Sequence, residues 1–198
     1  MSNSMFTTKQ VLRKARILKN PSKVYARHKG LHKRYKENPE LAMITDCAEV
    51  NGTNLQDPFR TTVSMNKELN VSFKVGVHRA VGGDHDFPNP GDMLCATLAS
   101  CMESTTRMIA NLYNIQLTKT RVHVSAIVDV RGTLRMDLST PVEFQSMHID
   151  FDVEAEGLNE KVLNMLIQGT KKSCIIYQTL KKGIPVTINV NSKNTKYA

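Results

Sequence analysis

Two cysteines far apart in the chain could do redox chemistry together if folding brought them close. Cys101 lies in the segment PNPGDMLCATLASCMESTTRMIANLY, and Cys174 lies in NEKVLNMLIQGTKKSCIIYQTLKKG. A thiolate can attack an electrophilic oxygen, and a second thiol can then close a disulfide with the oxidised sulfur. A buried cysteine can equally be a small apolar side chain with no chemistry. The pair is therefore a candidate redox site, and the distance between the two sulfur atoms is its first test.

Both cysteines lie in segments with the ends and the period of helices. In the first segment Asn89 can cap, Pro90 suits the first turn, and Asp92 places negative charge near the positive end of the helix dipole. The residues at helical spacing are Leu94, Leu98, Cys101, Thr105, Met108 and Leu112. In the second segment they are Leu163, Leu166, Ile167, Cys174 and Tyr177. With Asn159 as a cap and Gly183 as a stop, this predicts a second helix, and each thiol lies on an apolar helix face.

Strand patterns precede, separate and follow these two helices. The turn signal Asn51-Gly52 lies among the first strands and predicts a hairpin. Between the helices, TRVHVSAIVDVRG and VEFQSMHIDFDVEA alternate apolar and polar residues, as half-exposed antiparallel strands do. A final strand, IPVTINV, follows the second helix. The order of strands, helix, strands, helix and strand predicts an α+β fold with antiparallel sheets.

The charge divides the chain into two regions. Residues 1–40 contain 11 of the 27 Lys and Arg residues but only 2 acidic ones, whereas residues 41–198 contain 16 basic and 16 acidic residues. We interpret 1–40 as a basic, helical extension that is broken at Pro21, with Ser22 as a cap, and 41–198 as one domain. Such an extension can bind nucleic acid or a membrane surface. It contains no recognised nucleic-acid motif, so we favour a solvated or partner-docked extension.

Other classes of protein find little support in the sequence. No apolar run approaches the roughly 20 residues that a membrane span needs, and the N-terminus lacks a secretory signal pattern. The four cysteines do not resemble a disulfide scaffold, so we expect a cytoplasmic protein. Cys47 and Cys95 are interpreted as buried apolar residues. Without a CxxC motif or clustered histidines, we expect neither a metal nor a cofactor.

Two stretches resemble a known family. GGDHDFPNPGDMLCATLASC resembles the first-cysteine helix of the family of osmotically inducible protein C (OsmC) and the organic hydroperoxide resistance (Ohr) proteins. SCIIYQTLKKGIPVTINV resembles that family's second-cysteine helix and closing strand, so the similarity covers roughly residues 42–192. The resemblance implies an OsmC-like fold in which antiparallel sheets wrap around two central helices in an intertwined homodimer. Active sites would lie at the interface between subunits.

The resemblance also implies a thiol-dependent peroxidase. Cys101 would attack the O–O bond of a small organic hydroperoxide, releasing an alcohol and becoming a sulfenic acid. Cys174 would resolve it as a disulfide, which a dithiol reductant reopens. The nucleophile needs a lowered thiol pKa, so a cation must outweigh desolvation. The family supplies an arginine from its N-terminal strands. Arg60, in DPFRTTVS, is our candidate for this catalytic role, and Arg79 is a second option.

The chain departs from the family pattern at two places. The family has a glutamate ten residues before the first cysteine, which holds the arginine, and this chain has Gly91 there. Proline commonly follows the second cysteine, where this chain has Ile175. An arginine without its carboxylate is poorly pre-organised for catalysis. These departures support a second hypothesis: a non-catalytic protein of the same fold that binds an apolar or lipid-like ligand at the dimer interface.

Overall fold

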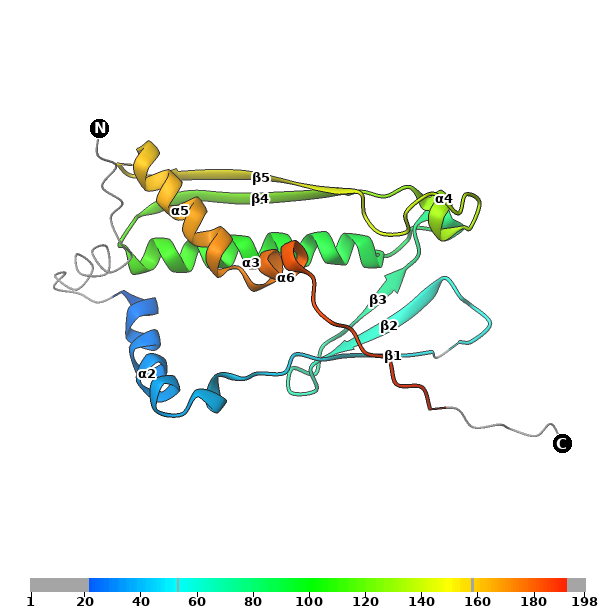
Figure 1. The fold of residues 1–198 in the computed structure, drawn as a ribbon, viewed down its shortest axis with the longest axis horizontal. Helices are drawn as coiled ribbons and strands as arrows, with labels where there is room; N and C mark the ends of the chain where they lie inside the picture. Colours follow the sequence, from blue (N-terminus) through cyan, green and yellow to red (C-terminus); the bar gives the residue numbers. More distant parts are fainter. Residues whose placement is uncertain (1–21, 53, 158, 192–198) are drawn as a thin grey trace.

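Helices and antiparallel strands alternate along the chain in the computed structural model, which describes residues 22–52, 54–157 and 159–191. The helices and 3-10 turns are α2 (Lys23–Glu37), η1 (Pro39–Ala42), η2 (Arg79–Val81), α3 (Pro90–Leu112), α4 (Val130–Thr133), α5 (Glu160–Ser173) and α6 (Ile175–Lys182). The strands are β1 (Ala48–Asn51), β2 (Arg60–Met65), β3 (Ser72–Gly76), β4 (Leu117–Ile127) and β5 (Ser146–Ala155). The predicted α+β class with antiparallel sheets is confirmed (Figure 1).

The N-terminal sheet has the order β1-β2-β3, with both pairs antiparallel. Asn51 pairs with Thr62, so β1 and β2 are joined by residues 52–59 rather than by the tight turn predicted at Asn51-Gly52. Val50, Leu69 and Val71 on or beside this sheet are more than half exposed. Figure 1 shows the sheet lying apart from β4 and β5, with α3 between them.

The second sheet is the antiparallel pair β4–β5, whose apolar face packs toward the helices. The cross-strand pairs on that face are Val122 with Phe151, Val124 with Ile149 and Ala126 with Met147. The alternation predicted for β5 is confirmed by its alternating exposed and half-buried residues. β4 ends at Ile127, earlier than the alternation through Val130 indicated, because Asp129 caps the short helix α4 there.

The long helix α3 is the centre of the fold and begins as predicted. The Asn89 side chain accepts the Gly91 and Asp92 N–H groups, and Asp92 accepts the Asn89 N–H, which completes a capping box. β4 packs along α3, and α5 and α6 also contact it (Figure 1). The buried apolar cluster between these elements consists of Leu98, Met102, Val124 and Cys174.

The C-terminal region departs from the sequence prediction in two ways. The helix expected through Cys174 breaks at that residue, which has φ −74° and ψ 110° and separates α5 from α6. Gly183, with φ +69°, ends α6 as expected. The strand predicted for residues 184–190 is not formed, because no strand of the described chain pairs with it. Its apolar side chains are largely exposed.

The basic extension is helical where the structure describes it. Ser22 caps α2 by accepting the Tyr25 N–H, as predicted, whereas the break expected at Pro21 lies outside the described residues. α2 is followed by η1, so the boundary proposed at residue 40 falls within that turn. No helix in the described ranges is long and apolar enough to cross a membrane.

Candidate redox site

The two cysteines selected from the sequence meet in the folded chain. The Cys101 and Cys174 sulfur atoms lie 3.1 Å apart although 73 residues separate them in sequence. Both are free thiols. A disulfide bond is about 2.0 Å long, so the two sulfurs are in contact without being bonded. The expectation that folding brings them within bridging reach is confirmed.

Cys174 is a helix-capping residue rather than a residue on a helix face. It ends α5 and caps α6, and its Sγ accepts the Tyr177 N–H at 3.4 Å. The side chain is fully buried, and this burial raises its pKa to about 11, although the Tyr177 N–H acts in the opposite direction. Cys101 receives the hydrogen bond from the Cys174 thiol and remains partly exposed. The geometry thus gives one partly exposed cysteine and one buried cysteine whose thiol donates to it.

A pair of buried hydroxyl groups holds the helices that carry the two cysteines. Thr106 on α3 and Thr170 on α5 are both fully buried, and their Oγ1 atoms lie 2.7 Å apart. Each hydroxyl also contacts a carbonyl of its own helix, that of Met102 or Leu166. The Thr170 carbonyl in turn accepts the Cys174 N–H at 2.9 Å. This contact lies about one turn from each cysteine and sets the spacing of α3 and α5.

An apolar pocket of about 550 Å³ borders the apolar cluster that contains Cys174, although neither Cys101 nor Cys174 is among its lining residues. It shares Leu98, Met147, Ile149 and Tyr177 with the cluster that packs around Cys174. Its remaining lining residues are Leu94, Glu143, Phe144, Ser146, Leu180 and Lys181. Most of this surface is apolar, with one acidic and one basic residue. A mostly apolar lining of this kind suits an organic ligand better than a small polar one.

Arg60 does not contact either sulfur within the described part of this chain. Its guanidinium makes ion pairs with Asp57 at 3.2 Å, with Asp86 at 2.8 Å and with Asp84. Asp84 and Asp86 lie just before α3, whereas Cys101 lies eleven residues into that helix, about 16 Å along its axis. The other option, Arg79, lies in η2 and has no hydrogen bond or ion pair to a sulfur among the described residues. The catalytic role of Arg60 therefore stays a prediction.

The ring of Phe144 fills the space beside Gly91. A Cβ at position 91 would lie 3.2 Å from Phe144 Cζ and 2.9 Å from the capping oxygen of Asn89. A glutamate would therefore have to displace the ring or disturb the helix cap. This packing explains physically why the position suits glycine, and it makes Phe144 a wall of the apolar pocket.

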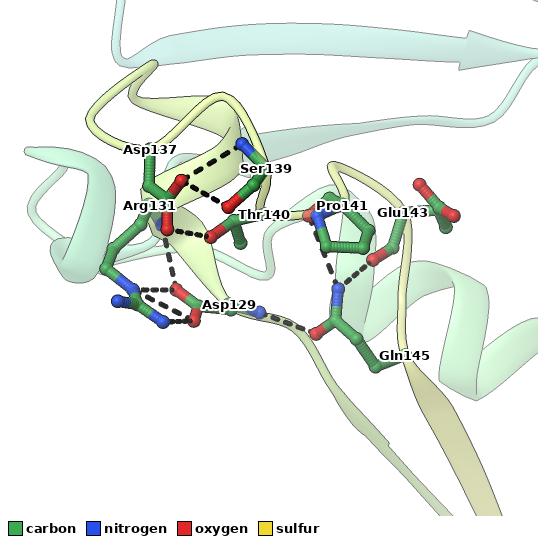
Figure 2. Close-up of polar contacts among 8 residues, drawn as sticks. All are labelled: Asp129, Arg131, Asp137, Ser139, Thr140, Pro141, Glu143 and Gln145. Atoms are coloured by element: carbon green, nitrogen blue, oxygen red, sulfur yellow. Dashed lines mark hydrogen bonds and ion pairs between the residues drawn. The ribbon is translucent and has the colours of Figure 1, made fainter.

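The segment between Asp129 and Gln145, which contains Phe144, is held by its own polar contacts. Figure 2 shows the contacts made by Asp129, Asp137 and Gln145. The Gln145 side chain accepts the Asp129 N–H at 2.7 Å and donates to the Glu143 carbonyl at 2.5 Å. Arg131 pairs with Asp129 at 2.5 Å. The Asp137 carboxylate accepts hydrogen bonds from Ser139 and Thr140. The polar contacts on both sides of Phe144 thus favour one conformation of the segment.

Sequence reasoning missed Phe144 and the Thr106–Thr170 pair. The sequence around these residues contains no motif. Phe144 packs against Gly91, and Thr106 contacts Thr170, so each contact joins residues more than 50 positions apart. The apolar environment expected for Cys47 is wrong, because that residue is exposed just before β1. Cys95 is half-buried, and burial raises its pKa. Among the described residues, no group of three or more His, Cys, Asp or Glu side chains could hold a metal ion.

A family model described as "OsmC-like protein" matches residues 83–189, which include both Cys101 and Cys174. No curated protein matches the sequence.

Several solved structures share the fold at low sequence identity. An OsmC-like protein from Mycoplasma pneumoniae is 13% identical with a TM-score of 0.56, and the alignment covers 71% of this chain and 89% of that one. An organic hydroperoxide resistance protein OsmC from Legionella pneumophila is 18% identical with a TM-score of 0.52, covering 71% and 91%. One from Elizabethkingia anophelis, also an organic hydroperoxide resistance protein, is 15% identical with a TM-score of 0.53, covering 71% and 91%. With the family model matching more than half of its residues, this chain belongs to the OsmC-like protein family.

Proposed function

We propose that the protein is a thiol-dependent peroxidase that reduces organic hydroperoxides, with Cys101 as the nucleophile and Cys174 as the resolving thiol. The observation that carries this proposal is the 3.1 Å contact between the two free sulfur atoms. Four residues of the cluster around Cys174 also line the apolar pocket. The unequal exposure of the two thiols supports the assignment of roles, because the nucleophile has to meet the substrate first. Two of the similar structures are named organic hydroperoxide resistance proteins, which supports the substrate class.

The reaction follows from the arrangement of the two sulfurs. The Cys101 thiolate attacks one peroxide oxygen, the O–O bond breaks, and the alkoxide takes a proton to leave as an alcohol. The resulting sulfenic acid is attacked by the Cys174 sulfur, which lies in contact with it. Water leaves and a disulfide forms. A dithiol then reduces the disulfide by two exchange steps and is itself oxidised to a disulfide.

Single turnover and steady state test this assignment separately. The reduced protein should consume cumene hydroperoxide with a dithiol, and Cys101→Ser should abolish turnover. Cys174→Ser should retain one turnover and leave a Cys101 sulfenic acid, which a carbon nucleophile such as dimedone traps for mass spectrometry. Cys95→Ser is the matched control because Cys95 lies on the same helix, and it should keep full activity. Equal rates for wild type and Cys101→Ser would refute the proposal.

A homodimer is the proposed functional form. Val186, Ile188 and Val190 alternate along the C-terminal segment and are each more than four-fifths exposed, and the N-terminal sheet also exposes apolar side chains. Apolar surface on this scale needs a cover, and a second copy of the chain would supply it. Light scattering should give twice the 22.2 kDa mass of one chain. Val186→Asp with Ile188→Asp should produce monomers, whereas aspartate at the alternating positions Thr187 and Asn189 should not.

Binding without catalysis is the second candidate function. The Arg60 guanidinium is occupied by three carboxylates, and no cation is seen to contact either sulfur among the described residues, so activation of Cys101 has no evident source within one chain. The apolar pocket of about 550 Å³ would then hold an apolar or lipid-like ligand. Native mass spectrometry of the purified protein discriminates the two. A retained apolar ligand together with thiols that do not react with hydroperoxide would favour binding.

A further inference from the structure

The exposed surface of α2 is strongly basic. Its fifteen residues include one acid, Glu37, and six basic residues: Lys23, Arg27, Lys29, Lys33, Arg34 and Lys36. All six basic side chains are exposed. At about 1.5 Å per residue the helix is about 22 Å long, so the charge is spread over an extended surface.

The basic residues of α2 form two rows that avoid its half-buried side. Val24, His28, Leu31 and Tyr35 recur at spacings of four, three and four residues and form a half-buried stripe. At about 100° per residue, Lys29, Lys33 and Lys36 project from the face opposite this stripe. The remaining three, Lys23, Arg27 and Arg34, share one flank. The cations thus occupy two rows and leave the half-buried stripe free of lysine and arginine.

α2 is attached to the body of the protein while its charge is left unbalanced. The Val24 N–H donates to Asn111 Oδ1 at 3.0 Å, which ties the start of α2 to the last turn of α3. Figure 1 shows α2 beside that end of α3, on the side away from β4 and β5. Elsewhere Arg107, Arg121 and Arg131 pair with acidic side chains. None of the ion pairs seen among the described residues uses a cation of α2.

We propose that the basic face of α2 binds the phosphate backbone of nucleic acid without sequence specificity. Rows of unpaired Lys and Arg release the counterions that condense on a polyphosphate chain, and this release drives such binding. The exposed ring of Tyr25 lies between the row of lysines and the half-buried stripe, where it can stack on a base of a single strand. These structural observations go beyond the sequence pattern, which by itself favoured a solvated extension.

An anionic membrane is a weaker fit to the same surface. A helix that lies in a membrane interface presents a broad apolar face to the lipid. Tyr25, at 36% exposure, is the one large apolar residue of α2 that is exposed, and the apolar stripe is half-buried against the protein. Lipid binding would therefore rest on charge alone.

Fluorescence anisotropy of the full chain with a labelled 20-nucleotide RNA and a duplex DNA of equal length tests the proposal. The dissociation constant should lie at about 10⁻⁴–10⁻⁶ M near physiological salt, and log K should fall linearly with log [salt]. A triple variant keeps the helix propensity of α2 while removing one row of charge; its substitutions are Lys29→Gln, Lys33→Gln and Lys36→Gln. It should reduce the salt slope by about 3 and weaken binding on the order of a hundredfold at about 0.1 M salt.

The control removes equal charge from the body of the protein. Lys67→Gln, Lys172→Gln and Lys182→Gln replace three exposed lysines outside α2 and should leave both the affinity and the salt slope within about twofold of wild type. Circular dichroism verifies that both variants stay folded. Absent or salt-independent binding, or equal binding by the α2 variant, would overturn the proposal. The proposal would also be overturned if the protein sedimented with phosphatidylserine vesicles but did not bind nucleic acid. Peroxidase activity is not used as a readout, so this proposal and the proposed function fail independently.

Discussion

The buried hydroxyl pair between α3 and α5 leads to a quantitative prediction about the spacing of the two cysteines. Thr170→Val replaces the hydroxyl by a methyl group of similar volume. It removes the 2.7 Å contact with Thr106 and the bond to the Leu166 carbonyl. Thr106 keeps its bond to the Met102 carbonyl, so its hydroxyl is not left fully unpaired. Loss of these two interactions of one hydroxyl should lower the free energy of unfolding by about 1–2 kcal/mol.

Urea unfolding of reduced protein measures this loss, and a double-mutant cycle isolates the pair. Each single variant loses the contact between the two hydroxyls, and the double variant loses it only once. Thr106→Val with Thr170→Val should therefore be less destabilised than the sum of the two single variants, by about 1 kcal/mol. Thr97→Val is the control, because that threonine bonds a carbonyl of α3 in the same way but is exposed. Its effect should stay within about 0.5 kcal/mol.

The same variant links packing to chemistry. If the hydroxyl pair sets the spacing of the helices, Thr170→Val should slow formation of the Cys101–Cys174 disulfide after one equivalent of oxidant, because loss of about 1 Å of positioning costs rate. Additive effects in the double-mutant cycle together with an unchanged rate of disulfide formation would refute this reasoning. The two threonines would then be simple packing residues.

Three further outcomes are expected. Burial raises the pKa of Cys174 to about 11 in the folded protein, so the unfolded chain loses this proton at a lower pH than the folded one. The free energy of unfolding should therefore fall as pH rises from about 9 to 11. Cys174→Ala should flatten this part of a pH series of urea melts. Gly91→Glu should displace the Phe144 ring and cost about 1–3 kcal/mol in the same melts, with no gain of peroxidase activity. Gly30 lies inside α2 with open space around it, so Gly30→Ala should stabilise that helix by about 0.5–1 kcal/mol. Amide hydrogen exchange of α2 should slow accordingly. Unchanged exchange would contradict the helix assignment.

The sequence patterns predicted local structure well where the determining contacts are local. The α3 cap was correctly predicted because Asn89 and Asp92 are three residues apart, and the Ser22 cap of α2 was correct for the same reason. The alternation in β5 was correct because a half-exposed strand has a period of two. The break of the second helix at Cys174 was missed, because the apolar spacing continues across it and no proline or glycine marks it.

The amino-acid order alone was enough to select Cys101 and Cys174, to place them near helices, and to separate a basic N-terminal region from a charge-balanced domain. Only tertiary packing decided that their sulfurs touch, that one thiol is fully buried with a pKa raised to about 11, and that Phe144 covers the position of Gly91. Propensities, caps and periodicities act over a few residues, whereas desolvation and contact distances depend on residues that folding brings together from distant parts of the chain.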